Sequence, residues 1–396
     1  MKKLLLIILI SFFCSFSLCA QEKPQQKNEY QFTVIKELPV TAVKNQSATG
    51  TCWSFAAVSF IESELIRTGK GEFDLSEMFI VHQSYCDKAD KYIRTNGNIN
   101  FTPGGCFGDV FTVFKNYGIV PQEIMSGLNY GTKNHIHKEM DMGLAGYINA
   151  LLKNPNRKYT PAWKEGLKGI LNAYLGEIPQ KFNYKGKEYT PRSFAAELSL
   201  NPDYYVSITS FLHHPFYQQF ALEIPDNWRW DLSYNVPIDD LMTIIDSAIE
   251  KGHSILWATD VSERGFKSKG IAVVPETEIE NMPESDQSKW VGLPKNKLNS
   301  KLFSLEQVVP EKKITQEERQ IAFDNGQTTD DHGMHIYGIA KDQNGNKYYM
   351  VKNSWGDSGD YKGTWYVSET YVKYKTTNIM VHKNIIPKEI KNKLGI

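Results

Sequence analysis

A cysteine at the start of a predicted helix is the feature that most constrains this chain. The loop that begins at Gln46 leads into Cys52, and small or apolar residues then recur on one helical face: Trp53, Ala56, Ala57, Phe60, Ile61 and Leu65. Thr51 is a suitable N-cap and Gly69 a suitable stop, which predicts an amphipathic helix that begins at Cys52. Unpaired N–H groups in a first helical turn favour an anion, so Cys52 stands where a thiolate is stabilised.

A nucleophilic thiol needs a base, a group that orients the base, and donors for the oxyanion. Two histidines in residues 330–338, His332 and His335, are candidate bases, and Asn353 is the candidate orienting group. Because residues three apart on a strand face opposite sides, the two histidines cannot both point into one site. Taken alone, a free cysteine such as Cys52 is more commonly a buried structural residue, and Asn353 would fit an ordinary amide at a strand end.

The segments that carry His332 and Asn353 have strand-like alternation, and the loop between them contains Asn344-Gly345, a combination typical of a hairpin. A two-residue turn at Asn344-Gly345 would set Asn353 opposite Ile336. We therefore expect a longer loop or a bulge, because either would bring Asn353 towards His332.

Gln46, Cys52-Trp53, His332 and the run Asn353-Ser354-Trp355-Gly356 resemble, in this chain order, the motifs of papain-like cysteine peptidases. Other segments are similar to one branch, the bleomycin hydrolase / aminopeptidase C family: residues 75–76, 104–105, 117–121, 189–191, 235–238 and 362–365. Helices early and strands late predict an α+β protein. The resemblance implies a papain-like fold with a helical lobe, an antiparallel β-barrel-like lobe and a large, mainly helical insertion at about residues 124–245.

The resemblance also implies roles for individual residues. It favours His332 over His335 as the base and leaves His335 as a packed, hydrogen-bonded histidine. Gln46 would donate its side-chain amide to the oxyanion beside the backbone N–H of Cys52. Catalysis of this kind needs no metal or organic cofactor.

A substrate-binding role follows for three further residues. Gly104 and Gly105 would form a strip that pairs with an extended substrate, because only glycine lets another backbone approach so closely. Trp355 would border the site and shield the bond between His332 and Asn353 from water.

Other histidines give weaker signals. His135 and His137, with Glu139, have metal-like spacing, but the polar composition around them predicts a solvated stretch. His213-His214 lies in an aromatic loop, which favours a surface or packing role.

The N-terminal segment has the order of a secretory signal. Lys2 and Lys3 precede an apolar run over residues 4–13, and small residues lead to Ala20. This order predicts cleavage after Ala20 and an exported chain, residues 21–396, that forms a single peptidase domain with its insertion. The apolar run is short for a spanning helix, so we expect no stable membrane insertion. Basic and acidic residues number 45 each, which gives no electrostatic reason to expect a nucleic-acid partner.

Removal of residues 1–20 would leave three cysteines, Cys52, Cys86 and Cys106. An odd number allows at most one disulfide and one free thiol. If Cys52 is the nucleophile, Cys86–Cys106 is the pair that leaves it free, and an oxidising compartment permits that bond. The sequence leaves open whether the bond forms.

These features predict an exported thiol peptidase that acts on peptides, and the resemblance implies an aminopeptidase that forms homo-oligomers. An endopeptidase, a thiol acyltransferase or amidase on the same scaffold, and a catalytically inactive binding protein are the alternatives. In the family a C-terminal arm limits cleavage to N-terminal residues. The tail that ends at Ile396 has no recognisable equivalent of that arm, which keeps the endopeptidase alternative open.

Overall fold

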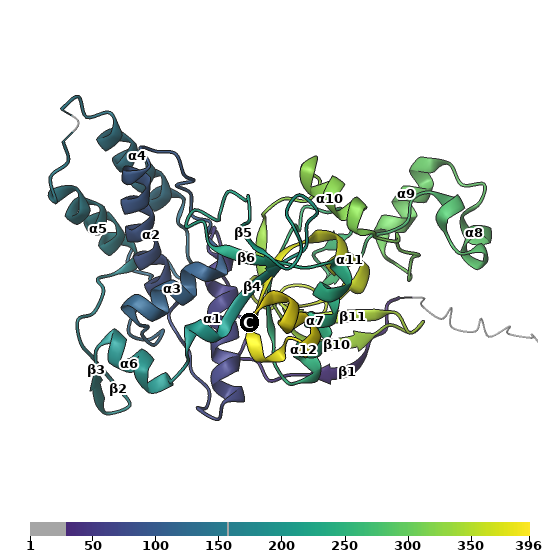
Figure 1. Cartoon of the computed structure of the whole chain (residues 1–396), viewed down its shortest axis with the longest axis horizontal. Coiled ribbons are helices and arrows are strands. Elements are labelled where there is room, and N and C mark those ends of the chain that lie inside the picture. Colours follow the sequence, from purple (N-terminus) through teal and green to yellow (C-terminus); the bar gives the residue numbers. More distant parts are fainter. Residues whose placement is uncertain (1–28, 157) are drawn as a thin grey trace, which may run out of the picture.

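Two lobes lie side by side in the structure, a computed structural model that describes residues 29–156 and 158–396 (Figure 1). The predicted signal segment, residues 1–20, lies outside the described residues. The helical lobe contains α1 (Cys52–Arg67), α2 (Glu77–Arg94), α3 (Phe107–Tyr117), α4 (Lys138–Leu152), α5 (Ala162–Leu175), α6 (Pro191–Leu198) and the short hairpin of β2 (Phe182–Tyr184) and β3 (Lys187–Tyr189). Within the described ranges, none of the helices has the length and apolar character that crossing a bilayer requires.

The second lobe is built on a mostly antiparallel sheet of eleven strands among the described residues. Its order is β5 (Gln219–Ala221), β6 (Leu232–Asn235), β4 (Tyr205–Thr209), β13 (Thr376–His382), β7 (Ile255–Thr259), β10 (His332–Lys341), β11 (Lys347–Lys352), β12 (Thr364–Ser368), β9 (Ile271–Ala272) and β8 (Phe266–Lys267). A further strand, β1 (Thr33–Glu37), pairs with β10. This division into helices and sheet confirms the predicted α+β class.

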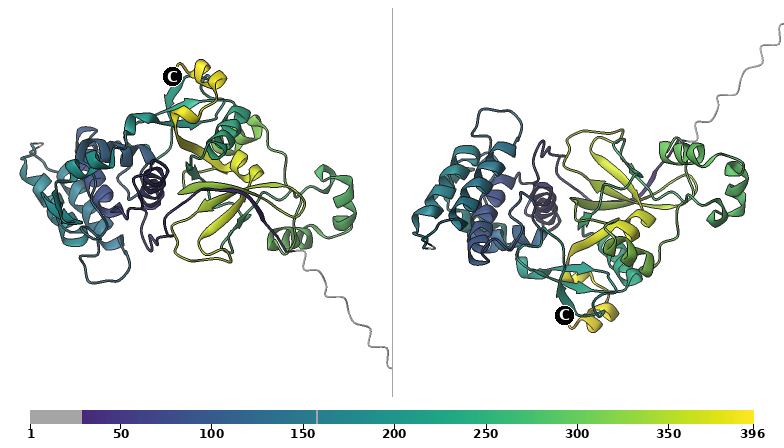
Figure 2. Two further views of the ribbon diagram at one scale, coloured as in Figure 1. Left: turned by 90° about the horizontal axis from the view of Figure 1, so that it is seen from below. Right: turned by 90° about the horizontal axis from the view of Figure 1, so that it is seen from above.

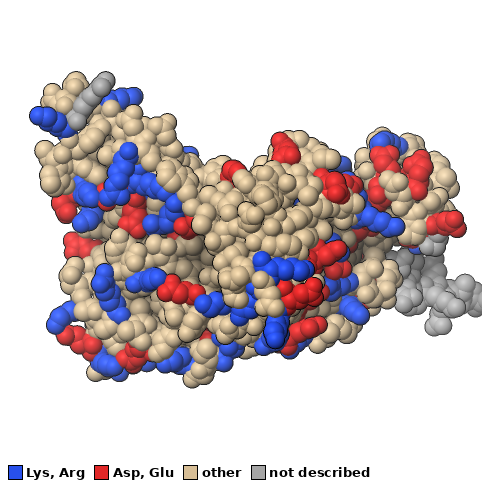
Figure 3. Space-filling model, in the orientation of Figure 1, with Lys and Arg blue, Asp and Glu red and all other residues tan. Residues whose placement is uncertain are grey.

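The remaining helices belong to the sheet lobe or project from it. They are α7 (Ile238–Glu250), α8 (Glu284–Trp290), α9 (Lys295–Ser304), α10 (Gln316–Asp324), α11 (Glu369–Lys375) and α12 (Lys388–Leu394). α7, α11 and α12 contribute apolar side chains to the core beside the sheet. α8 and α9 lie at the end of the molecule farthest from the helical lobe (Figure 1). On the face shown in Figure 3, acidic and basic side chains are interspersed, in keeping with the balanced composition.

Helix α1 lies between the two lobes and contacts α2 and α3 on one side and β10 and β7 on the other (Figure 2). It begins at Cys52 as predicted, but its prediction as an amphipathic helix is wrong, because all residues from Trp53 to Leu65 are buried. Most of its polar side chains have internal partners instead of water, although the Ser63 hydroxyl has none among the described residues. The Ser59 hydroxyl, for example, lies 3.0 Å from Nδ1 of His335 on the facing strand.

The first two helices begin at residues whose side chains could cap them. Ser76 caps α2, since its hydroxyl accepts a hydrogen bond from the backbone N–H of Phe79 at 3.0 Å. Thr51 is the N-cap residue of α1 but makes no capping bond with its side chain, because its hydroxyl pairs with that of Thr49 at 2.6 Å. The start of α1 is therefore held by its surroundings and not by a side-chain cap.

The segment predicted as a helical insertion, residues 124–245, is divided between the lobes. Its first part forms α4, α5 and α6, which pack in the core of the helical lobe. Its second part forms β4, β5 and β6, which extend the main sheet beyond β13. The helical character therefore holds for the part up to α6 and for the start of α7, and the strands between these helices belong to the sheet.

The hairpin of β10 and β11 has both of the irregularities that the sequence offered as alternatives, a longer loop and a shift of register. Residues 342–346 separate the last paired residues, Lys341 and Lys347, so the loop is longer than two residues. The register also shifts between Ile336 and Gly338. As a result Val351, and not Asn353, lies opposite Ile336, and Asn353 follows the end of β11 near the start of β10.

Candidate active site

The side chain of Cys52 opens into a small cavity between the lobes. The cavity is lined by residues of both lobes: Cys52, Trp53, Gly105, Cys106, Phe107, Ile224, Asp226, Ala258, Asp330, Asp331, His332, Gly333 and Asn378. Cys52 is in the first turn of α1, and His332 is the first residue of β10. The fold thus brings together the predicted nucleophile and the predicted base, which are far apart in the sequence.

His332 is held by the amide of Asn353. The ring Nε2 of His332 lies 2.8 Å from Oδ1 of Asn353, and the backbone N–H of Ser354 donates to the same oxygen at 2.7 Å. Since an amide oxygen only accepts, Nε2 carries the ring proton, and Nδ1 of the neutral imidazole is left as a proton acceptor. Trp355 covers this pair, with its ring centroid 4.8 Å from that of His332.

The surroundings favour a neutral thiol and a neutral imidazole before reaction. Desolvation raises the pKa of Cys52 to about 12, although a backbone hydrogen bond from Gly333 opposes the rise, and the carboxylates of Asp226 and Asp330 raise it further. Burial lowers the pKa of His332, and its bond to Asn353 opposes this. Burial therefore opposes the stabilisation of a thiolate that the helix N-terminus would give, and transfer of the thiol proton to a base would assist thiolate formation.

Gln46 is tied to the segment that follows Asn353. Its backbone N–H donates to the Ser354 carbonyl at 2.8 Å, and its Oε1 accepts from the Ser354 hydroxyl at 2.6 Å. Its side-chain nitrogen donates to the Thr49 carbonyl at 2.8 Å, which leaves one amide N–H for another acceptor. The role of Gln46 in an oxyanion hole stays a prediction.

Gly104 and Gly105 stand beside the cavity, and neighbouring side chains leave no space for a larger residue at either position. A Cβ atom at position 104 would collide with the carboxylate of Asp226. A Cβ atom at position 105 would lie 2.8 Å from Oδ2 of Asp109 and 3.0 Å from the Trp53 ring. Contacts within the chain therefore explain why both positions hold glycine. The pairing of Gly104 and Gly105 with substrate stays a prediction. A substrate contact of Trp355 stays a prediction as well.

His335 points away from the cavity. It is fully buried against α1, bonded to Ser59, and burial lowers its pKa to about 3. A base for peptide hydrolysis needs a pKa nearer neutrality, and its place as a packed histidine agrees with the expectation from the sequence.

All three cysteines in the described part of the chain are free thiols, so the bond between Cys86 and Cys106 that the sequence left open is absent. The physical reason is their placement. Cys86 faces a cavity between α2 and α5, beside Trp163 and Leu167. Cys106 caps α3 at its N-terminus and lines the cavity that Cys52 lines.

The other histidines differ in part from expectation. The stretch around His135 and His137 is largely exposed as predicted, Glu139 included, but the side chains of these two histidines are buried. The loop around Ala48 covers these two residues through backbone hydrogen bonds. His213 and His214 place their ring nitrogens 3.0 and 2.8 Å from the carboxylate of Glu223. The three ligand atoms lie within 4.8 Å of one another, a spacing that suits a metal, but the two histidines already share the carboxylate.

The sequence did not predict several of the residues that line the cavity. Two of them belong to a loop between β5 and β6, residues 222–231, which we call the strap. Ile224 and Asp226 of the strap line the cavity of Cys52. Nothing in the polar and aromatic composition of this loop marks it as part of an active site. Asp330 also lines the cavity, and its position two residues before His332 was the available signal.

Two family models match the chain. The model described as Papain family cysteine protease matches residues 29–156, and the model described as Peptidase C1-like family matches residues 285–395. Aminopeptidase C of Streptococcus thermophilus is 24% identical over 414 residues, which cover 93% of this chain and 86% of the relative. Aminopeptidase G of Lactobacillus delbrueckii subsp. lactis is 22% identical, with 89% and 83% covered.

A solved structure has the same fold. The crystal structure of PepW from Lactobacillus rhamnosis matches with a TM-score of 0.68 at 21% identity, covering 92% of this chain and 84% of that one. The two-lobed fold and the family matches define a papain-like cysteine peptidase, as the motifs predicted. Within that class, relatives named Aminopeptidase C match this chain over nearly its whole length, which supports the aminopeptidase C family.

Proposed function

We propose that this peptidase is an exported aminopeptidase that removes N-terminal residues from peptides through Cys52, His332 and Asn353. The 2.8 Å hydrogen bond from His332 to Asn353, in the wall of the cavity that Cys52 lines, is the observation that carries the catalytic assignment. The aminopeptidase activity is supported by the names of the relatives, Aminopeptidase C and Aminopeptidase G. Export is supported by the charged, apolar and small-residue order of residues 1–20.

Acylation begins with transfer of the Cys52 thiol proton to Nδ1 of His332. The thiolate attacks the carbonyl carbon of the scissile bond, and negative charge moves to the carbonyl oxygen. The backbone N–H of Cys52 and the free amide N–H of Gln46 hold that oxygen. The imidazolium, oriented by Asn353, gives its proton to the leaving amine, and a thioester on Cys52 remains.

Deacylation reverses the roles of the partners. Neutral His332 takes a proton from water, the hydroxide attacks the thioester carbonyl, and the carboxylic acid leaves as the thiol regains its proton. Trp355 lies against the imidazole throughout and keeps bulk water from the hydrogen bond to Asn353. Transfer to an amine in place of water would give the acyltransferase alternative.

The test compares Cys52→Ser with Cys106→Ser, a matched variant of a second free cysteine that lines the same cavity. We expect Cys52→Ser to lower kcat/KM for a peptide with a free N-terminus by a factor on the order of 10⁴ or more. It should also abolish labelling by an epoxide inhibitor, whereas Cys106→Ser should retain both activity and labelling.

Two results would contradict the proposal. Full activity of Cys52→Ser would remove the nucleophile from the mechanism. Equal cleavage by the wild-type enzyme of a peptide and its N-acetylated analogue, with internal bonds cut, would instead favour an endopeptidase.

A further inference from the structure

The strap, residues 222–231, crosses from the sheet lobe to the helical lobe. It leaves the sheet after β5 and returns to it at β6. Between these strands Trp228 Nε1 donates to Asp109 Oδ2 at 2.9 Å, and Arg229 Nε donates to Asp109 Oδ1 at 2.6 Å. Arg229 also donates to Asp87 at 2.7 Å. Because the Asp109 carboxylate is only 1% exposed, these bonds hold the strap firmly on α2 and α3.

The strap carries Asp226 into the cavity of the proposed nucleophile. The Asp226 carboxylate lies against Gly104, so closely that a Cβ atom there would collide with it. Asp226 and Cys52 line the same cavity. Oδ1 of Asp226 accepts from Asn100 at 3.0 Å, and Oδ2 has no hydrogen-bond partner among the residues that the structure describes. One carboxylate oxygen of a residue that lines the cavity is therefore left without a hydrogen-bond donor in the described part of the chain.

A second carboxylate stands beside the first. The backbone N–H of Asp226 donates to Oδ2 of Asp330 at 3.3 Å. Burial raises the pKa of Asp226, and burial together with the charge of Asp226 raises that of Asp330 to about 7. The cation that most favours ionised Asp226 is Lys88, whose ammonium donates to the carbonyls of Thr102 and Gly104. Within residues 29–156 and 158–396, neither carboxylate forms an ion pair. Asp226 and Asp330 therefore lack a directly bound counter-charge, which a cationic ligand would supply.

We propose that Asp226, supported by Asp330, binds the α-ammonium group of the substrate and so restricts cleavage to free N-termini. The inference rests on the proposed function, since it requires that Cys52 attack a peptide in this cavity. An ammonium group can donate to the free Oδ2 of Asp226, and it would relieve the repulsion between the two carboxylates. An N-acetylated peptide offers a neutral amide instead, which would leave the buried carboxylates without a counter-charge.

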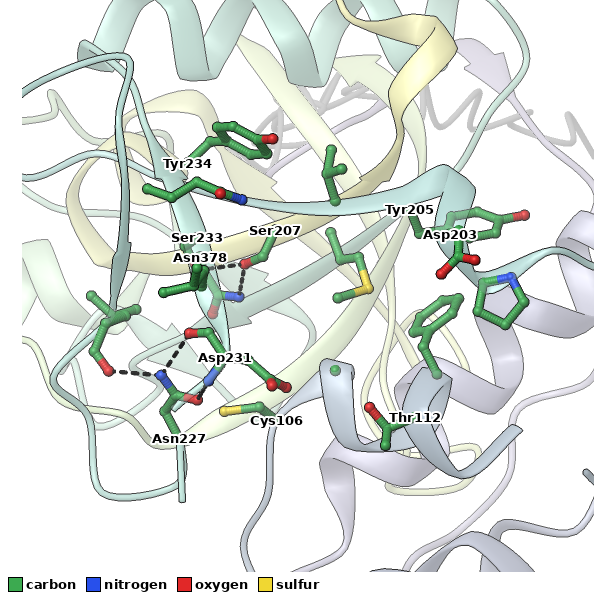
Figure 4. Close-up of a pocket in the computed structure, with 18 of the residues that line it drawn as sticks. Cys106, Thr112, Asp203, Tyr205, Ser207, Asn227, Asp231, Ser233, Tyr234 and Asn378 are labelled. Carbon is green, nitrogen blue, oxygen red and sulfur yellow. Dashed lines mark hydrogen bonds between the residues drawn. The ribbon is translucent and has the colours of Figure 1, made fainter. Parts of the chain in front are cut away.

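The strap provides a matched control in Asp231. Its carboxylate belongs to the same loop but lines a neighbouring cavity of about 340 Å³, which also receives Cys106 (Figure 4). Asp231 does not line the cavity of Cys52, and its backbone N–H and carbonyl bond to the side chain of Asn227. Asp226→Asn and Asp231→Asn each replace one carboxylate of the same loop by an amide. Asp226→Asn does so inside the proposed site and Asp231→Asn outside it.

The experiment measures kcat/KM for an aminoacyl-coumarinamide and for its N-acetyl analogue. We expect Asp226→Asn to lower kcat/KM for the free amine by about 10- to 100-fold, with no loss for the acetylated substrate. Asp231→Asn should keep the wild-type preference. An unchanged preference in a folded Asp226→Asn, or an equal change in Asp231→Asn, would overturn the assignment.

A binding measurement separates this proposal from the proposed function. In the Cys52→Ala background, calorimetry should show that trialanine binds with higher affinity than N-acetyltrialanine. Adding Asp226→Asn should weaken the affinity for trialanine by about 10- to 100-fold. Equal binding of the two peptides would overturn the role of Asp226 even if the enzyme is a peptidase. If the wild-type enzyme cleaves no peptide but the Cys52→Ala variant still prefers trialanine, the role of Asp226 is supported and the proposed function is contradicted. If Asp226→Asn does not fold, Asp226→Glu, which keeps the charge, must retain the preference.

Discussion

At the scale of single residues, Asn353 does most to decide what His332 can do. Two donors converge on its Oδ1, the ring Nε2 of His332 and the backbone N–H of Ser354. Its own side-chain nitrogen is buried without a partner among the described residues. The amide oxygen therefore favours the tautomer with the proton on Nε2, in which Nδ1 can accept the proton of Cys52 in the proposed mechanism.

We predict that Asn353→Ala lowers kcat by about 10-fold or more with little change in KM, because the lost hydrogen bond orients the base and does not hold substrate. Steady-state kinetics with a free-amine peptide checks this, with the melting temperature measured to confirm folding. A rise in KM at constant kcat would show that Asn353 acts in binding instead.

The conservative variant Asn353→Asp tests the role of His332 through the pH dependence of kcat/KM. Asn353→Asp keeps an acceptor for Nε2 but adds a negative charge that favours the imidazolium, so it raises the pKa of His332. Since neutral His332 is the base, we expect the acid limb of the kcat/KM profile to move to higher pH than in the wild type. A shift to lower pH would contradict the assignment of His332 as a base that starts neutral.

At the scale of secondary-structure elements, the C-terminal half of α1 is anchored by one buried carboxylate. Glu64 is 1% exposed and accepts from Arg67 Nε at 2.7 Å and from the Tyr205 hydroxyl at 2.8 Å. Burial alone would raise its pKa, but hydrogen bonds from His253, Arg67 and Tyr205 lower it to about 2. A carboxyl whose pKa is lower in the folded state stabilises the fold above its unfolded pKa and loses this effect as pH falls.

We therefore predict that Glu64→Gln lowers the free energy of unfolding at pH 7 by about 3 kcal/mol, and that the difference from wild type shrinks as pH falls from about 4.5 towards 2. Urea unfolding at a series of pH values checks this. Glu165→Gln, at a side chain that is 74% exposed, is the control and should differ little from wild type at any pH. A difference for Glu64→Gln that does not change with pH would contradict the electrostatic explanation.

The elements that could be predicted from the sequence are those with local signals. Ser76 is a residue type that commonly caps a helix, and it does so at α2. The alternation in the strands of His332 and Asn353 predicted a hairpin with a longer loop or a bulge, and the observed hairpin has both. The prediction for α1 failed because its polar residues find partners on β10 and on neighbouring helices, and such contacts leave no periodic trace. The strap was missed for a similar reason, since Asp226 matters only because the fold lays it on Gly104.

At the scale of the whole molecule, each lobe contributes part of the candidate site. The helical lobe supplies Cys52, and the sheet lobe supplies His332 and Asn353. The papain-like motifs were enough to predict this division. The assignment of β4, β5 and β6 to the sheet was not predictable in the same way, because it depends on pairing with β13 at the other end of the chain.

Export is a property of the whole chain, and we predict a mature N-terminus at Gln21. The full chain expressed in a bacterium should appear outside the cytoplasm without its first 20 residues, because Lys2, Lys3 and the apolar run address it to the secretion machinery. N-terminal sequencing and the intact mass check this. Ile8→Arg, which interrupts the apolar run, should keep the chain uncleaved inside the cell; uncleaved wild-type protein in the cytoplasm would contradict export.

The hairpin of β10 and β11 has a practical consequence for protein engineering. Its tip, residues 342–346, is at the opposite end of β10 from His332. β10 is also paired with β7 and β1, and β11 with β12, so neighbours as well as the turn fix the register. Length changes at the tip are thus insulated from the chemistry. Asn344-Gly345 is accordingly the natural place to insert an affinity tag or a fluorescent reporter without disturbing the enzyme.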